Sequence, residues 1–321
     1  MRVMVAKSWS RKACNEDAVG SRADGAWVID GASALEPGPL VEGLPGAAWV
    51  SSVASSFLTD VDWDGLTLTD VLADLIGHLI ERGRRAGLTE AGTSRSSGFP
   101  TAAISVVRQR ADVLELCLLG DAPVVFTGAG PDGPDRPDSP DSRLGAGTGP
   151  RVFTDPQYDC VEQELLSTVR ADLDRGDSPA TAYGRIHATL LDHRARRNTE
   201  AGSWILGDVP EAARHARSLS VPLTGAGDVL ICSDGFGRLV EPFGLVDGYG
   251  ALLAAVRAGA AEHLVARLRE AELADPGRVR HPRFGVSDDA SVVHTVLEPV
   301  GPAGGQAKGT TAGTCAAAPL Q

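Results

Sequence analysis

Aspartate stands at one end of each of four apolar segments that have the composition of β-strands. The acids are Asp30, Asp121, Asp234 and Asp288, in the stretches WVIDG, CLLGD, ICSDG and SDDASVV. A single Asp-Gly after a strand is usually a tight turn, because both residue types favour chain reversals. The recurrence of aspartate at four strand ends indicates instead that these carboxylates share one site.

Carboxylates that converge in a protein repel one another strongly unless a cation or protons lie between them. Sets of oxygen ligands suit the hard ions Mg²⁺ and Mn²⁺, whereas zinc usually binds histidine or cysteine. The seven histidines show neither HxH nor HExxH spacing. A pair of Mg²⁺ or Mn²⁺ ions can produce hydroxide near neutral pH and clamp a phosphoryl group during in-line displacement. The aspartates therefore predict metal-dependent chemistry on a phosphate ester.

The composition narrows the class of protein. The 321 residues carry a formal net charge of -12, which argues against nucleic acid or an anionic membrane as a partner. Five widely spaced cysteines without a CxxC pair indicate neither a disulfide framework nor a cysteine zinc site. The start MRVMVAKSWSRK lacks the apolar core of a signal peptide, and no apolar run is long enough to span a membrane. We expect a cytoplasmic protein.

The periodicity of apolar residues predicts elements that would bring the aspartates together. Strands are expected at 2–6 and 26–29, separated by a polar loop, and the segments TAAISVVR and VLELCLLG predict an antiparallel hairpin. Helical spacing runs over 41–58 and 69–87, and two further helices precede the last strand, ASVVHTVL. Helices in consecutive pairs do not fit a βαβ fold with one helix per strand. The pattern favours antiparallel sheets with helix pairs outside them.

Three segments differ from this core pattern. Residues 128–150 are mostly Gly, Pro, Asp and Ser and are predicted to be a flexible insertion, because they cannot bury enough apolar area to offset the entropy lost on ordering. Residues 155–220 mix short helical stretches and are predicted to form a smaller lobe inserted between core strands. Residues 299–321 are predicted to be a disordered tail. The main domain is therefore expected at residues 1–298.

The order of the acidic motifs resembles a known family. NED at residues 15–17, followed by IDG, GD, SDG and DD in strand context, is similar to the PPM-type metal-dependent protein phosphatases, also called the protein phosphatase 2C family, and especially to bacterial members. The resemblance covers roughly residues 2–298. It implies an α+β fold, a four-layer αββα sandwich of two antiparallel β-sheets flanked by helix pairs, with a binuclear metal site at one end between the sheets.

The resemblance also implies roles for individual residues and two Mn²⁺ or Mg²⁺ ions as cofactors. The implied metal ligands are Asp30, Gly31, Asp234, Asp288 and Asp121, of which the last would bind a third, weaker ion. Asp30 resembles the carboxylate that bridges both ions. Gly31 would bind through its carbonyl, which can approach an ion closely because glycine lacks Cβ. Glu16 and Asp17 match the NED acids, which act near or through metal-bound waters.

The chain departs from the family pattern at two places that concern catalysis. The family commonly has an arginine five residues before the NED aspartate to hold the substrate phosphate, and this chain has Lys12 there, with Arg11 beside it. Either residue is expected to hold the phosphate, although lysine lacks the planar fork of arginine. Ala32 follows the first Asp-Gly, where animal and plant members often carry a histidine that protonates the leaving group. Metal-bound water or His281 would then have to protonate the leaving group.

Residues 155–220 occupy the place of the family's flap, which abuts the site and influences the choice of substrate. The candidate substrate-side residues within this segment are Arg196, Arg197, Asn198 and Trp204. A basic surface run and a core tryptophan are the alternative interpretation of these residues.

The resemblance implies a serine/threonine protein phosphatase of signal transduction, in which a metal-bridging water attacks phosphoserine or phosphothreonine directly. Its partner would be a phosphorylated protein, and it would oppose a serine/threonine kinase, with no nucleic-acid or membrane partner. Two alternatives stay open: a catalytically silent pseudophosphatase that acts by binding, and a phosphatase of a small phosphorylated metabolite. Converging acids argue against the first, because a scaffold has no need of them.

Overall fold

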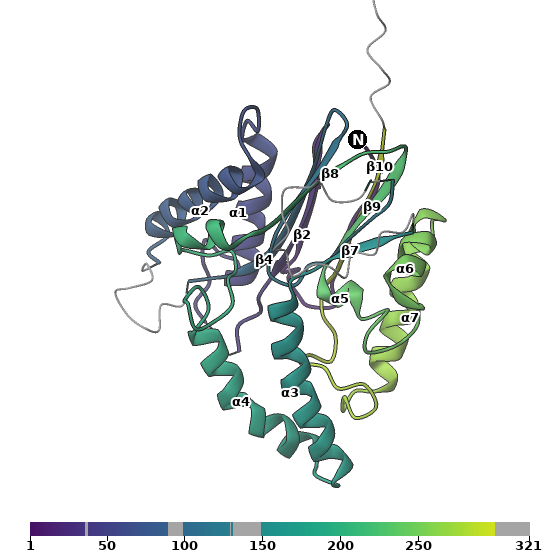
Figure 1. Cartoon of the computed structure of the whole chain (residues 1–321). Coiled ribbons are helices and arrows are strands. Elements are labelled where there is room, and N and C mark those ends of the chain that lie inside the picture. The colour runs from purple at the N-terminus through teal and green to yellow at the C-terminus, as the bar shows by residue number, and fades with distance from the viewer. Residues whose placement is uncertain (36–37, 89–98, 129, 131–148, 299–321) are drawn as a thin grey trace, which may run out of the picture.

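The computed structural model describes residues 1–35, 38–88, 99–128, 130 and 149–298 (Figure 1). Within these residues, two five-stranded antiparallel sheets form the centre of the molecule. Sheet A contains, in spatial order, β1 (Arg2–Trp9), β10 (Ala290–Leu297), β9 (Gly227–Cys232), β6 (Val124–Phe126) and β7 (Arg151–Phe153). Sheet B contains β2 (Ala18–Ser21), β3 (Gly25–Gly31), β4 (Ala102–Arg110), β5 (Val113–Leu119) and β8 (Arg217–Pro222).

A pair of helices covers the outer face of each sheet (Figure 1). The pairs are α1 (Gly46–Asp60) with α2 (Leu68–Arg85) on sheet B, and α6 (Gly248–Arg257) with α7 (Ala261–Ala274) on sheet A. Helix α2 begins where Thr67 and Asp70 form a reciprocal capping box, which satisfies backbone amides that a helix start leaves unpaired. The predicted four-layer αββα arrangement of two antiparallel sheets with outer helix pairs is confirmed.

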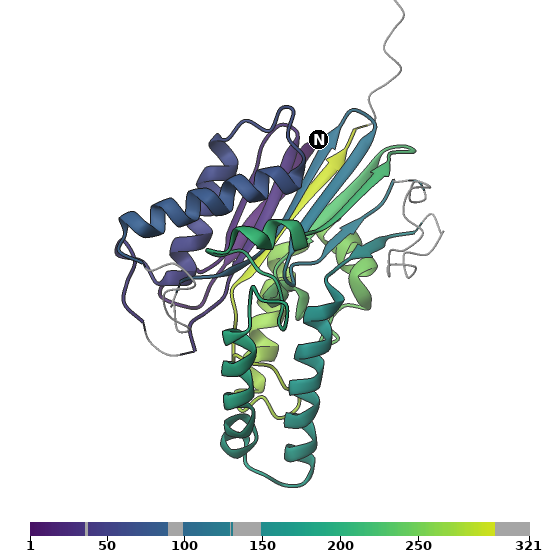
Figure 2. The same ribbon diagram turned by 60° about the vertical axis from the view of Figure 1, so that its left-hand side comes forward.

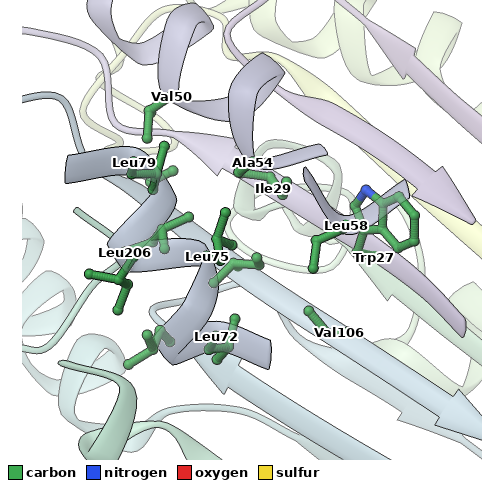
Figure 3. Packing of buried hydrophobic residues seen from close by; sticks show 14 of the residues in the cluster. Trp27, Ile29, Val50, Ala54, Leu58, Leu72, Leu75, Leu79, Val106 and Leu206 are labelled. Carbon is green, nitrogen blue, oxygen red and sulfur yellow. The ribbon is translucent and has the colours of Figure 1, made fainter. Parts of the chain in front are cut away.

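Strand β3 is buried on both faces and carries Asp30 near its end. Trp27 and Ile29 pack against the helices α1 and α2 (Figure 3), while Ala26 and Val28 point the other way, into the cluster between the two sheets. Successive side chains of a strand point to opposite faces, so both sides of β3 are held by packing. This packing fixes the place at which the Asp30 carboxylate emerges.

A helical hairpin projects from one end of the sandwich (Figure 2). It consists of α3 (Pro156–Asp174) and α4 (Pro179–Ala195), which share a small apolar cluster of their own. Each helix has proline in its first turn and a capping side chain before it, since Asp155 accepts from Gln157 N and Ser178 from Thr181 N. The hairpin therefore forms a separate structural unit beside the two sheets.

The lobe predicted at 155–220 has a smaller extent in the structure. After the hairpin, the chain returns to the main body, where Leu206 forms a bridge with Ala102 and the 3-10 helix η1 (Pro210–His215) packs on α2. Strand β8 then joins sheet B beside β5. Only the hairpin and the loop after it stand apart from the sandwich.

Short strands are the elements that the sequence did not predict. Strand β2 lies inside the expected polar loop, and β6 and β7 have three residues each. The predicted insertion at 128–150 falls almost entirely outside the described residues, and the predicted tail at 299–321 falls wholly outside them. In the ranges that are described, no helix is both long and apolar enough to cross a membrane.

Candidate active site

The four strand-end aspartates line one pocket of about 770 Å³ at an end of the sandwich. Sheet B contributes Asp30, near the end of β3, and Asp121, two residues after β5. Sheet A contributes Asp234, which starts the short helix α5 (Asp234–Gly237) after β9, and Asp288, two residues before β10. Gly31 and Lys12 line the same pocket. Acids that are far apart in the sequence thus face one space.

The glycines after two of these acids allow other acidic segments to approach. A Cβ on Gly31 would lie 2.3 Å from the carbonyl oxygen of Glu16, and a Cβ on Gly235 would lie 1.9 Å from that of Asp289. Any side chain at either place would therefore displace backbone that carries another acid of the site. The expected use of the Gly31 carbonyl is one reason for a glycine at this position, and the close approach of the Glu16 backbone is a second.

Burial and mutual repulsion raise the pKa values of several of these carboxyls. Burial is the largest cause for Asp30, whose pKa lies well above its ordinary value, and the neighbouring charge of Asp17 adds to it. Burial likewise raises the pKa of Asp17 to about 7, although Ser291 Oγ donates a hydrogen bond of 2.7 Å to its carboxylate. Among the described residues, no basic side chain pairs with the carboxylate of Asp17 or Asp30.

Asp288 stands in the opposite electrostatic environment. Lys12 Nζ donates to Asp288 Oδ1 at 3.1 Å, and Arg238 Nη2 donates to Asp288 Oδ2 at 2.8 Å. Burial alone would raise the pKa of Asp288, but Arg238 and Lys12 outweigh it and hold the pKa below its ordinary value. Lys12 also donates to Glu16 Oε2 at 2.6 Å. The acids of the pocket are therefore unequal in charge compensation.

The donor chemistry of the pocket fits a hard divalent cation. Asp30, Asp121, Asp234 and Asp288 line the pocket and offer only oxygens, which Mg²⁺ and Mn²⁺ prefer, and Asp17 does not line it. One carboxylate oxygen of the buried Asp289 also has no hydrogen-bond partner among the described residues. Across those same residues, no group of three or more His, Cys, Asp or Glu side chains is arranged to hold a metal ion. The acids face one space and repel one another across it, which contributes to the raised pKa of Asp30.

The helical hairpin forms a second wall of the pocket, and this wall is apolar and basic. Its apolar residues are Val161, Leu165, Ile186 and Leu190. Arg194 Nη1 donates to the Ser33 carbonyl at 2.6 Å, and its buried Nε has no hydrogen-bond partner among the described residues. Burial, and then the neighbouring charge of Arg197, lower the pKa of Arg194 to about 10. Two guanidinium groups that repel each other beside a pocket provide a place for an anion.

Of the four predicted substrate-side residues, Arg197 lines the pocket. Arg196 points outward and pairs with Asp192 at 2.6 Å. Asn198 accepts a hydrogen bond from Ile205 N at 2.8 Å and so shapes the loop after α4. Trp204 stacks on His215 with a ring separation of 3.7 Å and packs against the core of sheet B.

The other predicted residues differ in their access to the pocket. Arg11 is exposed and does not line it, and neither does His281, whose Nδ1 lies 2.8 Å from the Pro242 carbonyl. Arg194 and Arg238 line the pocket but were not predicted from the sequence. Arg194 lies three residues before Arg197 on a helical stretch, a spacing that places both on one face and could have identified it. No comparable signal marked Arg238.

No family model and no curated protein matches the chain. Among solved structures, the serine/threonine phosphatase PstP/Ppp of Mycobacterium tuberculosis matches 93% of this chain and 100% of its own, with 17% identity and a TM-score of 0.49. PppA, a regulatory component of T6SS in Pseudomonas aeruginosa, matches 91% and 96%, with 16% identity and a TM-score of 0.47. Stp1 of Staphylococcus aureus, a serine/threonine phosphatase, matches 92% and 93%, with 10% identity and a TM-score of 0.48. This chain is similar to each of these proteins over at least 91% of its length, at 10% to 17% identity.

Proposed function

We propose that this protein is a Mn²⁺- or Mg²⁺-dependent phosphatase that hydrolyses phosphoserine and phosphothreonine in proteins. The observation that carries the proposal is the pocket that combines partly buried, mutually repelling aspartates from both sheets with the arginines Arg194 and Arg197. Such acids favour cations, and the arginines favour an anion. A phosphate ester bound between them would satisfy both.

The residues that would hold the ions are Asp30, Asp234, Asp288, Asp121 and the carbonyl of Gly31. When bound, such ions supply a nucleophile derived from water and neutralise the charge of the phosphate. Asp17 and Glu16 would orient that nucleophile from behind the pocket. Asp17 is held for this role by Ser291, and Glu16 by a backbone hydrogen bond of 2.8 Å from its own N to Asp289 Oδ2.

Arg194 would hold the substrate phosphate, with Arg197 beside it, in preference to Lys12 or Arg11. Arg194 has a buried donor without a partner in the described residues, whereas Lys12 contacts acids and Arg11 is exposed. A planar guanidinium also matches the geometry of phosphate oxygens. The apolar residues on α3 and α4 would contact the substrate chain next to its phosphorylated residue.

A phosphorylated protein, and hence opposition to a serine/threonine kinase, is favoured over a metabolite. The apolar wall formed by Val161, Leu165, Ile186 and Leu190 suits the side chains of a peptide and offers little to a small polar ester. A pseudophosphatase role is disfavoured because the repulsion between Asp30 and its neighbouring acids destabilises a fold that never binds a cation.

The test is hydrolysis of p-nitrophenyl phosphate, phosphopeptides and phosphorylated metabolites by the purified chain during titration with Mn²⁺. We expect turnover that depends on Mn²⁺, a preference for phosphopeptides, and loss of turnover in Asp234→Asn. Asp74→Asn is the matched control, because Asp74 is exposed on α2, outside the pocket. Absence of turnover at every Mn²⁺ concentration would overturn the proposal, and so would an Asp234→Asn variant as active as the control.

A further inference from the structure

We propose that Lys12 and Arg238 serve as built-in cations for the Asp288 half of the pocket, so that this chain binds one divalent ion tightly and a second only when Lys12 leaves Asp288. The inference rests on the proposed function, since it concerns the metal stoichiometry of the same site. According to this inference, Asp30 needs a cation from solution, whereas Asp288 already has two from the protein.

Every donor of the Lys12 ammonium group is engaged. Its Nζ donates to Glu16 Oε2 at 2.6 Å, to Ser33 Oγ at 2.9 Å and to Asp288 Oδ1 at 3.1 Å, and lies 3.4 Å from Asp289 Oδ2. A lysine has three hydrogen-bond donors, so no N–H remains for a phosphate. Lys12 sits among oxygens in the manner of a bound cation.

Both oxygens of Asp288 are also engaged. Oδ1 accepts from Lys12 and from the backbone N of Asp289 at 3.0 Å, and Oδ2 accepts from Arg238 at 2.8 Å. By contrast, Asp30 Oδ2 accepts a longer bond, 3.3 Å, from the backbone N of Asp234. A divalent ion can bind to Asp30 without displacing a charged side chain. At Asp288 the ion would compete with Lys12 and Arg238.

Arg238 is the fixed member of the pair. Its side chain is 8% exposed and lies 3.7 Å from the fully buried Glu272 of α7, which also pairs with Arg269 at 2.8 Å. Arg269 in turn donates to the Trp9 carbonyl, at the end of β1. This network ties Arg238 to the helix layer behind sheet A, so its charge stays beside Asp288.

Lys12 is the exchangeable member. It lies on the loop between β1 and β2, and its side chain is 32% exposed. A flexible side chain of this kind can turn to solvent, and its ammonium is readily hydrated there. The second ion would therefore bind in exchange for Lys12.

The experiment is a titration of the full chain with Mn²⁺, followed by calorimetry and by electron paramagnetic resonance of free Mn²⁺. We expect one tight ion in the wild-type protein, and a second that binds at least about tenfold more tightly in Lys12→Met than in wild type, because a repelling positive charge has been removed. Lys12→Arg keeps the charge and should retain the wild-type stoichiometry. Lys7→Met is the matched control, since Lys7 pairs with Glu262 on the surface, away from the pocket.

Two equally tight ions in the wild-type protein would overturn the inference, as would a Lys12→Met variant with unchanged binding of the second ion. The wild-type stoichiometry decides even if Lys12→Met fails to fold, which its circular dichroism spectrum would reveal. Phosphatase activity combined with two equally tight ions would overturn this inference alone. One tight ion without any turnover would overturn the proposed activity and leave the inference standing.

Discussion

Asp30 and Asp288 are the same residue type, and each lies beside the end of a strand at the acidic pocket, yet their charges are balanced differently. Burial and neighbouring acids raise the pKa of Asp30, whereas Arg238 and Lys12 lower that of Asp288. The difference comes from the neighbours, because burial acts to raise the pKa of both carboxyls. A shared motif therefore predicts where acids lie, and leaves open which of them need an external cation.

The largest expected effect is the difference between substituting Asp30 and substituting Asp288. We expect Asp30→Asn to weaken the tight Mn²⁺ site by roughly a hundredfold or more, because it removes an uncompensated charged ligand. We expect Asp288→Asn to change the affinity of that same site by less than about tenfold, since Asp288 already has protein cations. Calorimetric titration of both variants measures the contrast. Equal losses of Mn²⁺ affinity in the two variants would show that Asp30 and Asp288 do not differ in their need for an external cation.

A second prediction concerns the cation that meets the substrate. We expect Arg194→Met to raise the KM for a phosphopeptide by about tenfold with a smaller change in kcat, because a charge-assisted contact to phosphate is lost on binding. Arg196→Met is the matched control, since Arg196 pairs with Asp192 outside the pocket. Steady-state kinetics at saturating Mn²⁺ measure both variants. If Lys12→Met raised KM and Arg194→Met did not, the phosphate would be held by Lys12.

The smallest expected effect is a pH dependence of stability in the metal-free protein. Asp17 has a pKa of about 7 in the folded protein, above its value of about 3.9 in an unfolded chain, so the folded state binds its proton more tightly. The stabilisation from that proton is present at low pH and is lost as pH rises through 7. We expect Tm to fall by at least about 3 °C between about pH 5 and pH 8.

Thermal unfolding in the presence of a chelator measures this effect, and Asp17→Asn should reduce it. The raised pKa values of Asp30 and Asp234 act in the same direction and should account for the remainder. The lowered pKa of Asp288 has the opposite sign, but its stabilisation is lost only as pH falls below the ordinary aspartate range, outside this window. Saturating Mn²⁺ should also flatten the profile. A metal-free protein whose Tm rises between pH 5 and pH 8 would contradict the prediction.

Elements with strong local patterns were predictable from the sequence. The apolar stripe of α2 and the hairpin of β4 and β5 were predicted because periodicity and β-branched residues identify them without reference to the rest of the chain. Strands β6 and β7 were missed because three residues carry no period. They form because β6 pairs with the edge of β9 and β7 pairs with β6.

Composition and alternation are local properties, so they were enough to predict acids at strand ends in antiparallel sheets. Which charges meet depends on the tertiary structure. Lys12 reaches Asp288 across 276 positions, and Arg194 reaches Ser33 across 161. Such contacts depend on how the hairpin, the loop after β1 and helix α5 pack against the sheets. Electrostatic interactions depend on distance in space, so the balance of charge at each aspartate follows from packing.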